Sequence, residues 1–379
     1  MSPARKKPSR ARSPAKPARR ARSGLAKLGL GVGVLALLAL VPLALAARSA
    51  WQVMRPWKGY PERARTVIVE PGTGAGQILE ILAREGVIED ARLARFYLVY
   101  FLHNQPLKAG EYEFSGAQSL QEVLRKLAKG EVVRHSITLV EGLTLEETAG
   151  QLAQGGFGRL DALLSLMRSP ELIADLDPEA QDLEGYLFPE TYSFVRGTPE
   201  REVVSTLAKT FRARWNKAVA PLLASRPGPP SVRHVVTLAS IVEKEARLDS
   251  ERPLIAAVYQ NRLDARIGLM ADPTVIFALK KLKVWSGNIH RSDLSVDSPY
   301  NTYKVAGLPP GPIASAGLKS LVAAAAPAAV PYLYFVSRND GSHAFAATLA
   351  EHNANVERWQ RQFFRDKRAE ARRMGEGLR

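Results

Sequence analysis

The chain has 379 residues, of which 46% are hydrophobic and none is cysteine. That length can hold about two domains with cores of their own. The lack of cysteine excludes disulfides, thiolate zinc sites and cysteine nucleophiles. The formal net charge is +16, but ten of the basic residues lie in the first 27 positions, which contain no acidic residue. The rest of the chain is only mildly basic, so we expect no nucleic-acid partner.

The N-terminus is predicted to be a basic tail followed by one membrane-spanning helix. Residues 1–24 have the Pro, Arg, Lys, Ala and Ser content that is typical of disorder. Residues 25–48 form the predicted transmembrane helix, because the run from Leu28 to Ala47 carries no charge and about 20 apolar residues suffice to cross the hydrocarbon layer. The alternative is a cleavable signal peptide, although the run is longer than such segments usually are. The basic tail favours a cytoplasmic N-terminus, with everything after the span outside. Three aromatic residues are expected at the membrane interface: Trp51, Trp57 and Tyr60.

A small α+β module is predicted over residues 62–157. Strand-like runs alternate there with amphipathic helices, and turn or capping residues separate them. Ser119, with Glu122 three residues later, predicts a capping box, and Gly130 predicts the end of that helix. The module could bind a polymer or act as a spacer. Its expected strands are Thr66–Glu70, Gly110–Phe114 and Ser136–Glu141.

Residues 158–365 are predicted to form a second, mixed α+β domain. The segment Leu183–Phe194 gathers four aromatic residues around Glu184 and Glu190. Sugar rings stack on aromatic faces and sugar hydroxyls pair with carboxylates, so this segment is a candidate saccharide site, although a well-packed turn has the same composition. The expected helices cover Glu202–Ala220, stopping near Pro221, then Pro253–Asp264, and a third helix starting at Asp272; a buried strand is expected over Pro331–Ser337.

The stretch Val235–Leu248 contains the strongest candidate for a catalytic residue. A carboxyl group kept from water holds its proton, because desolvation raises its pKa, and is then ready to donate that proton. Glu243 points away from this stripe. The alternative is that Glu245 merely pairs with a buried Arg or Lys. At helical spacing one stripe combines five apolar residues with one carboxyl group: Val235, Leu238, Ile241, Val242, Glu245 and Leu248.

Other chemistries have weaker support. No two histidines have a metal-ligand spacing such as H-x-x-x-H, and the G-x-S-x-G elbow of many serine hydrolases is absent from the sequence. A long loop, Ser298–Leu321, carries Tyr300 and Asn301 and is too apolar to be disordered. A carboxyl group on an apolar helix face, an aromatic segment with carboxylates and an Asn/Tyr-rich loop, all outside a membrane, together indicate glycan chemistry.

Five segments of the second domain resemble the motifs of the endolytic murein transglycosylase family, also called MltG or YceG-like. The module before them is similar to the family's LysM-like region, and the single N-terminal span also matches. The resemblance therefore implies an α+β fold with one transmembrane helix, a LysM-like module and a catalytic domain. In the family's order, from Leu183 to Asn353, the segments are L-E-G-Y-L-F-P-E-T-Y, A-S-I-V-E-K-E-A, A-D-P-T-V-I-F, S-P-Y-N-T-Y-K-V-A-G-L-P-P-G-P-I, and P-Y-L-Y-F-V with G-S-H-A-F and T-L-A-E-H-N.

The resemblance implies cleavage of the β-1,4 bond between N-acetylmuramic acid and N-acetylglucosamine within nascent peptidoglycan strands. The product would carry a 1,6-anhydro muramyl end, which limits strand elongation and makes the enzyme a lyase. It would need no cofactor or metal. It would sit in the bacterial inner membrane, with its catalytic domain outside the cytoplasm and peptidoglycan synthases nearby. The family's catalytic glutamate is the second of the E-K-E pair, here Glu245. The expected substrate-binding residues are Glu184, Glu190, Tyr192, Asp272, Tyr300 and Asn301.

The chain departs from the family pattern at two places. Met270-Ala271 stands where a polar pair usually precedes Asp-Pro-Thr-Val, and Ala-Ser-Ala-Gly at 314–317 replaces an Asn-Pro-Gly ending. Both changes put substrate contacts in question. Two other functions stay open: a hydrolytic muramidase in which Glu243 or Glu190 positions water, and a non-catalytic glycan-binding scaffold of the cell-wall synthesis machinery.

Overall fold

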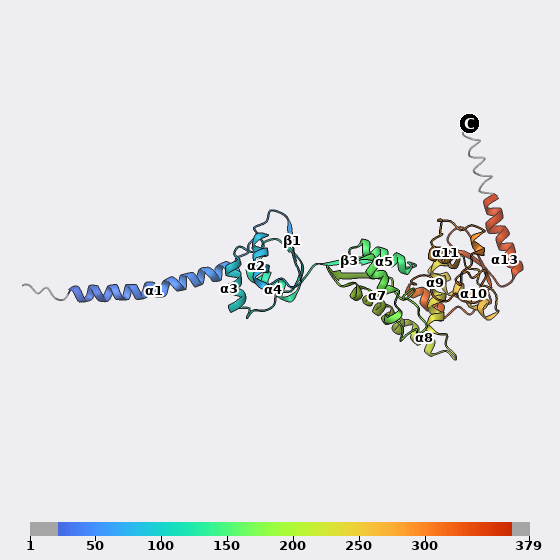
Figure 1. The fold of residues 1–379 in the computed structure, drawn as a ribbon, viewed down its shortest axis with the longest axis horizontal. Helices are drawn as coiled ribbons and strands as arrows, with labels where there is room; N and C mark the ends of the chain where they lie inside the picture. The colour runs from blue at the N-terminus through green and yellow to red at the C-terminus, as the bar shows by residue number, and fades with distance from the viewer. Residues whose placement is uncertain (1–21, 366–379) are drawn as a thin grey trace, which may run out of the picture. The chain divides into compact units, whose positions relative to one another are not determined.

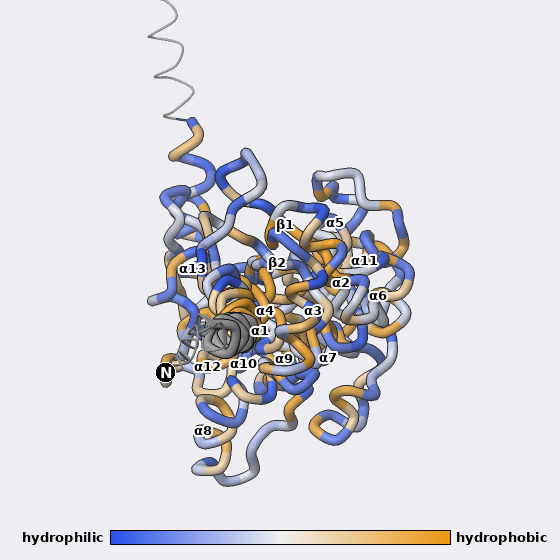
Figure 2. The backbone as a smooth tube through the Cα atoms, turned by 90° about the vertical axis from the view of Figure 1, so that its left-hand side faces the viewer, coloured by the Kyte–Doolittle hydropathy of each residue, from blue (hydrophilic) through white to orange (hydrophobic). Residues whose placement is uncertain are grey.

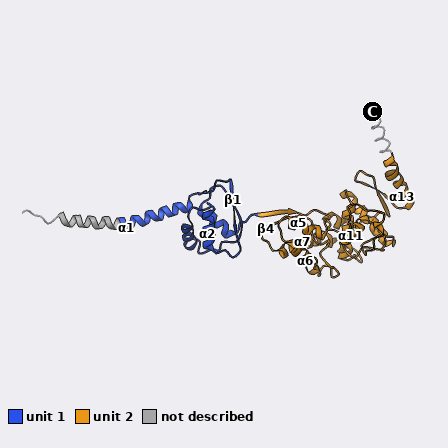
Figure 3. Ribbon diagram, turned by 45° about the horizontal axis from the view of Figure 1, so that its top comes forward, with its two compact units in different colours: residues 1–133 blue, residues 134–379 orange. Residues whose placement is uncertain are grey.

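The computed structural model describes residues 22–365 and confirms a mixed α+β chain (Figure 1). Its described strands form three separate two-stranded antiparallel sheets, β1 with β2, β3 with β4 and β5 with β6. The chain divides into two compact units, one ending at Val133 and one beginning at Arg134, which Figure 3 colours separately. Each unit has its own hydrophobic core. Nearly all of the predicted basic tail lies outside the described residues.

The first unit begins with the long apolar helix α1, Arg22–Met54. Within it, Leu37–Met54 is long and apolar enough to cross a membrane, and only 6% of that segment is buried. The helix therefore extends beyond the predicted span of residues 25–48. The prediction that Tyr60 lies at the membrane interface is wrong. Tyr60 is buried in the core of the unit, and its hydroxyl donates to the carbonyl of Phe114 at 2.9 Å.

The rest of unit 1 folds two strands and three helices around one core. In chain order they are β1 (Ala64–Val69), α2 (Ala75–Arg84), α3 (Ala91–Tyr100), β2 (Gly110–Ser115) and α4 (Leu120–Lys129). Apolar residues at strand and helix spacing supply the core, including Ile78, Leu82, Tyr112 and Leu124. The first two predicted strands and the helices that follow them are confirmed. The structure adds α3, which was not among the predicted elements.

The segment from 134 to 157 belongs to unit 2, although it was expected in the small module. Its strand β3, Arg134–Thr138, pairs antiparallel with β4, Thr191–Val195. Its helix α5, Leu145–Gln154, contributes Leu152 and other apolar residues to the core of unit 2. The boundary falls here because β1 and β2 pair with each other, while the partner of β3 comes later in the chain.

Unit 2 is mostly helical. The helix expected to stop near Pro221 continues to Ala224 through a π-helical turn, because a proline in the first turn of α8 loses no intrahelical hydrogen bond. The strand predicted to be buried, β5, is only half-buried along its length. The remaining elements are α6 (Leu160–Met167), η1 (Pro170–Leu172), α7 (Glu200–Arg214), η2 (Trp215–Val219), α8 (Ala220–Ala224), α9 (Val232–Glu245), η3 (Asp249–Glu251), α10 (Arg252–Asp264), α11 (Asp272–Lys281), η4 (Asp293–Ser295), α12 (Leu318–Ala325), β5 (Tyr334–Ser337), β6 (His343–Ala346), α13 (Leu349–Val356) and η5 (Glu357–Gln362).

Helix α9 lies at the centre of the second core. Every residue from Val235 to Val242 is buried, and the helix packs against α10, α11 and α12. Figure 2 shows hydrophobic stretches on helices such as α4 and α9 and mostly hydrophilic residues along the outer loops. Burying one Val, Leu or Ile side chain fully stabilises a fold by about 1.5–3 kcal/mol. This packing therefore fixes the position of α9 and of the residue at its end.

The capping box of α4 offers a test of the local sequence rules. The Ser119 hydroxyl accepts from the backbone N–H of Glu122 at 3.3 Å, and the Glu122 carboxylate accepts from the N–H of Ser119 at 2.7 Å. Replacing an N-cap serine by alanine costs about 1 kcal/mol. Ser119→Ala should therefore speed amide hydrogen exchange in the first turn of α4 several-fold, as measured by mass spectrometry. The matched control is Gln121→Ala on the same helix but outside the box; equal acceleration by both variants would contradict the assignment.

Candidate functional site

Helix α9 begins at a capped serine and ends at the candidate catalytic residue. The Ser231 hydroxyl accepts a hydrogen bond from the backbone N–H of His234 at 3.2 Å, as an N-cap does. The last helical residue is Glu245. Leu248 was predicted to continue the same apolar stripe, and that prediction is wrong. It is 43% exposed, because the helix has already ended.

The carboxyl group of Glu245 lies where water is scarce and a neutral hydrogen-bond donor is present. Glu245 is only partly exposed, and the hydroxyl of Tyr259 on α10 donates to its Oε1 at 3.1 Å. Desolvation raises the pKa of Glu245 to about 7, the Tyr259 hydrogen bond opposes this shift, and the negative charge of Asp272 adds to it. The C-terminal end of α9 also disfavours a carboxylate. Glu245 therefore keeps its proton to much higher pH than an exposed glutamate does.

The alternative in which Glu245 pairs with a buried cation has no support in the described part of the chain. The groups that shift its pKa are Tyr259 and Asp272, and neither is a cation. A nearby Arg or Lys would lower the pKa of the carboxyl group instead of leaving it raised. Glu245 is therefore suited to donate a proton.

Asp272 opens α11 on the same side as Glu245. The Tyr303 hydroxyl donates to Asp272 Oδ1 at 2.6 Å, and the charge of Glu245 also reaches Tyr303. The buried hydroxyl of Thr302 accepts from the backbone N–H of Ala271 at 3.0 Å. This bond fastens the Asn/Tyr-rich loop to the start of α11. The loop therefore brings Tyr303, and not the predicted Tyr300, close to the candidate acid.

Glu243, the first glutamate of the E-K-E pair, has a different environment. Its Oε1 forms an ion pair with Arg252 at 3.0 Å, in which both side chains are almost fully buried. Its Oε2 accepts from the backbone N–H of Gly317 at the start of α12. Breaking such a buried pair by removing one partner costs about 3–5 kcal/mol. Glu243 therefore joins α9 to α10 and α12.

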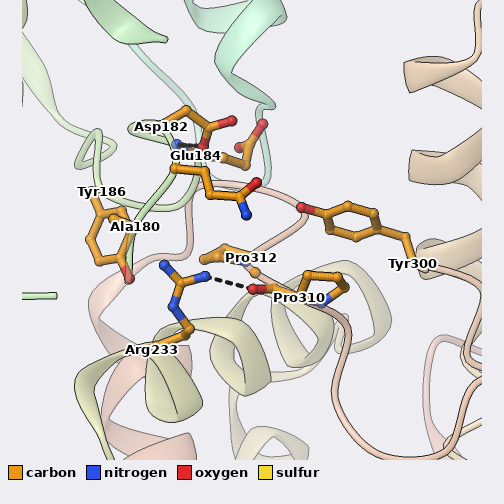
Figure 4. A pocket seen from close by; sticks show the side chains of 10 residues that line it. Ala180, Asp182, Glu184, Tyr186, Arg233, Tyr300, Pro310 and Pro312 are labelled. Carbon is orange, nitrogen blue, oxygen red and sulfur yellow. Dashed lines mark hydrogen bonds between the residues drawn. The ribbon is translucent and has the colours of Figure 1, made fainter. Parts of the chain in front are cut away.

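A second site lies around Glu184, in the pocket shown in Figure 4. Oε2 of Glu184 accepts from the backbone N–H of Leu145 at 2.9 Å, while Oε1 has no partner among the described residues. Burial raises the pKa of Glu184 to about 8. Figure 4 shows Tyr300 reaching toward Asp182 and Glu184 from the opposite wall, and Arg233 donating to the carbonyl of Pro310 at 2.6 Å.

A larger cavity, of about 460 Å³, adjoins the same two acidic residues. Its walls combine them with the start of α5 and the last turn of α11, including Lys281. The Lys281 ammonium group lies 5.2 Å from the centre of the Tyr300 ring. Glu184 and Tyr300 are therefore brought together, but their contacts do not include Glu245.

The other predicted site residues are held by contacts of their own. Glu190 forms an ion pair with Arg214 at 2.7 Å. The hydroxyl of the buried Tyr192 donates to a backbone carbonyl at 2.6 Å. Asn301 is fully buried, and its amide donates to the carbonyls of Leu294 and Val296, just before its loop, at 3.0 and 2.8 Å. Through these bonds Asn301 fixes the conformation of the loop that carries Tyr300 and Tyr303.

Sequence reasoning missed Tyr259, Tyr303 and Thr302. Tyr259 ends a run of buried residues on α10 that starts at Ile255, where a tyrosine is ordinarily taken as part of the core. Its hydroxyl reaches Glu245 only because α10 folds back against α9. Thr302 and Tyr303 are part of a quoted motif, so their loop was found but not their individual contacts.

The two departures from the family pattern have different surroundings. Ala314, Ser315 and Ala316 are buried, and the backbone of Ser315 bonds to Leu143 and Gly142 beside α5 at 2.8 Å. That change therefore affects packing. Met270 is 53% exposed with a left-handed backbone (φ 49°), so its side chain is open to solvent beside Asp272.

The site thus defines a class: a protein with a carboxyl group of raised pKa, set at the end of a buried helix, that can act as a general acid. The comparisons identify the family. The YceG-like family matches residues 67–358. An endolytic murein transglycosylase of Bacillus subtilis is 32% identical over 307 residues, covering 77% of this chain and 83% of the relative. One from Streptococcus pneumoniae is 30% identical over 77% of this chain, which spans 57% of that longer relative.

A solved structure agrees with this match. The crystal structure of a YceG-like protein from Listeria monocytogenes is 34% identical, with a TM-score of 0.53 over 77% of this chain and 98% of that one. The chain belongs to the YceG-like family.

Two substitutions should move the pKa of Glu245 in opposite directions. Tyr259→Phe removes a hydrogen bond that favours the carboxylate, so the pKa should rise; Asp272→Asn removes a negative charge, so it should fall. We expect shifts on the order of one pH unit. The carboxyl carbon can be titrated by ¹³C NMR, with Glu245→Gln to identify its signal. Tyr192→Phe, which also removes a buried tyrosine hydroxyl, should leave the titration unchanged, and shifts of equal sign in the two test variants would contradict the geometry.

Glu184 should make stability depend on pH. The folded chain holds this proton up to about pH 8, whereas its ordinary pKa is 4.5. The folded state therefore binds more protons than the unfolded state between these values, and the free energy of unfolding falls as pH rises through them. Glu184→Gln should flatten this loss and stabilise the protein at pH 9 by up to about 5 kcal/mol, since the rise from 4.5 to about 8 is worth about 1.4 kcal/mol for each pKa unit.

The measurement is urea unfolding at pH 5 and pH 9. The matched control is Glu190→Gln, which removes a carboxylate that is paired with Arg214 near the surface. If the wild type and Glu184→Gln lost the same stability between the two pH values, the assignment of a buried neutral acid would fail.

Proposed function

We propose that this chain cleaves the β-1,4 bond between N-acetylmuramic acid and N-acetylglucosamine inside peptidoglycan strands, with Glu245 as its catalytic residue. Curated relatives are named endolytic murein transglycosylases, and as a member of their family the chain is an enzyme of the lyase class that acts on murein. The observation that carries the finer proposal is the neutral carboxyl group at the end of α9, held by Tyr259 and free of cations in the described structure.

The reaction needs only one carboxyl group. Glu245 first gives its proton to O4 of N-acetylglucosamine as the bond from that oxygen to C1 of the muramyl residue breaks. The resulting carboxylate then takes the proton of the C6 hydroxyl of the same muramyl residue. The C6 oxygen bonds to C1 and closes the 1,6-anhydro ring, so protons balance and no water is consumed. Tyr259 would stabilise the transient carboxylate, because its hydroxyl already donates to that group.

The remaining residues have graded roles in this proposal. The negative charge of Asp272, whose carboxylate accepts a hydrogen bond from Tyr303, raises the pKa of Glu245 and so keeps Glu245 protonated for the transfer. Glu184 and Tyr300 would bind a more distant part of the glycan, since they share a pocket. Asn301 acts through the loop that it shapes. Glu190 and Tyr192 stay substrate-binding candidates, and their own hydrogen bonds argue for a supporting role. No cofactor or metal is part of the mechanism.

The proposal includes the membrane. Helix α1 would anchor the protein in the bacterial inner membrane, with the N-terminus in the cytoplasm and the parts of both units that follow α1 outside it. The support is one apolar helix of sufficient length. Unit 1, with two helices between paired strands, would be the LysM-like module, and unit 2 the catalytic domain. At this location the enzyme would meet strands as the peptidoglycan synthases produce them and would limit their length.

A hydrolytic muramidase is the second candidate. It would need another carboxylate to activate water or attack the sugar. Glu243 and Glu190, the predicted candidates, are both engaged in ion pairs. The observation that favours this function is that Asp272, a second carboxylate, is close enough to Glu245 for its charge to raise the pKa of Glu245. A non-catalytic scaffold, the remaining alternative, would not need a neutral Glu245.

Product analysis tests the proposal. The full chain in detergent should convert purified peptidoglycan to fragments with 1,6-anhydro muramyl ends, seen by mass spectrometry. Glu245→Gln should reduce these ends by at least about 100-fold, the usual range for a lost acid–base group. Reducing muramic acid ends in place of anhydro ends would establish the muramidase instead.

The matched control for this assay is Glu171→Gln, which changes an exposed glutamate paired only with Arg201 at the surface. It should leave the yield of anhydro ends unchanged. Glycan strands in cells that carry Glu245→Gln should become longer. Unchanged strand lengths would favour the scaffold.

A further inference from the structure

Helix α3 presents a cluster of exposed aromatic rings. Phe96 contacts Tyr100 with ring centres 4.7 Å apart, and Tyr97 stacks on Phe101 at 5.2 Å. Phe96 is 50% exposed, Tyr100 65% and Phe101 61%. The helix buries Ala94 and Leu98 in the core of unit 1, so the rings lie on its outer side. Exposed apolar clusters of this kind mark surfaces that bind a partner or a membrane.

The aromatic cluster adjoins the end of α1. Helices α1 and α3 contact each other, as Figure 1 also shows. Between them is an apolar hollow of about 570 Å³. Leu45, Val53 and Met54 line it from α1, and Phe96 and Phe101 from α3. The mainly apolar surface of α1 therefore continues onto α3, with Ser49 and Gln121 as the polar residues of the hollow.

The position of this surface along α1 indicates its surroundings. The uncharged run of α1 ends at Ala47, and Arg48 follows. The hollow begins at Leu45 and ends at Met54, so it lies where a spanning helix leaves the hydrocarbon layer for the headgroups. Aromatic residues are enriched at that depth, because their rings are apolar while tyrosine hydroxyls and tryptophan N–H groups face water. Trp51, 59% exposed on the same part of α1, fits this pattern.

The exposed basic residues around the surface outnumber Glu89 and Asp90, the exposed acidic residues just before α3, and Glu89 is itself paired with Arg55. Arg48 and Lys58 are exposed after the span, and Arg92 and Arg95 are exposed on α3. Helix α3 itself carries no acidic residue. Basic residues near a membrane each contribute about 1 kcal/mol of attraction to an anionic surface.

We propose that α3 is a membrane-contacting helix, whose aromatic cluster inserts beside α1 at the boundary between headgroups and acyl chains. Unit 1 is then held against the bilayer by two apolar elements. This inference rests on the proposed membrane anchor and goes beyond it, because a single spanning helix alone would leave the α3 surface in water. The aromatic cluster of α3 contacts lipid in this proposal, and neither a second copy of the chain nor another protein.

Because the sequence contains no cysteine, a single introduced cysteine can be labelled specifically. Single variants Phe96→Cys and Tyr100→Cys in the full chain carry a bimane label, and the protein is reconstituted in nanodiscs containing anionic lipid brominated near the glycerol end of the acyl chain. We expect the label at both positions to be quenched several-fold more than at Ile68→Cys, a control on β1 that is 42% exposed and apolar. Leu40→Cys, on the exposed apolar part of α1, reports on the anchor itself.

Each possible outcome either supports or overturns the membrane contact of α3. Strong quenching at 40, 96 and 100, with little at 68, supports the proposal. Quenching at 40 alone overturns the membrane contact of α3 and leaves the anchor intact. Absence of quenching at 40 overturns the anchor and this inference together, while the product assay still tests the catalytic proposal. Labels at 96 and 100 that are shielded from iodide but unquenched by brominated lipid show a protein partner and overturn the choice of lipid.

Discussion

The chemistry that we propose for this chain depends on keeping one carboxyl group from water without giving it a cation. Glu245 meets this constraint because α9 is buried on all sides up to Val242 and ends at the glutamate itself. An arginine beside Glu245 would stabilise the carboxylate and remove its readiness to donate a proton. The hydroxyl of Tyr259 is a milder partner, since it can donate to the carboxylate without bringing a positive charge. The pKa of about 7 is the result of these opposing effects.

Glu243, in the same helix turn, is buried together with a cation. Glu243 is buried with Arg252 and bonded to the backbone of Gly317, so its charge is fully compensated. A Cβ at Gly317 would meet the Glu141 side chain, so the start of α12 lies against Glu141 as well as against Glu243. Two residues along, the helix points Glu245 about 200° away. The ion pair holds α9, α10 and α12 together, and the position of Glu245 relative to Tyr259 depends on this attachment.

The sequence predicted well what is decided locally. The capping box at Ser119, the glycine that ends α4 and the apolar stripe leading to Glu245 follow from spacing alone, and the structure confirms these elements. Contacts between distant segments could not be predicted in this way. The pairing of β3 with β4 moved the unit boundary to residue 133. In the sequence, Tyr259 cannot be told from an ordinary core residue. Only the packing of α10 against α9 brings its hydroxyl to Glu245. Helix α3 escaped prediction because its exposed residues change from Arg92 and Arg95 to aromatic ones, so it lacks the continuous polar stripe of a surface helix.

Helix α11 keeps the two acidic sites apart, and this separation bears on the reaction. Asp272 at its start belongs with Glu245, whereas Lys281 at its end lies over the ring of Tyr300, in the pocket of Glu184. Ten helical residues span about 15 Å, more than the roughly 5–9.5 Å between the paired carboxyl groups of ordinary glycosidases. Glu184 is not among the groups that shift the pKa of Glu245. Glu184 is therefore poorly placed to serve as the second carboxylate of a hydrolase, and Asp272 is already bonded to Tyr303. A mechanism in which Glu245 gives and then takes the proton is the one that these neighbours best support.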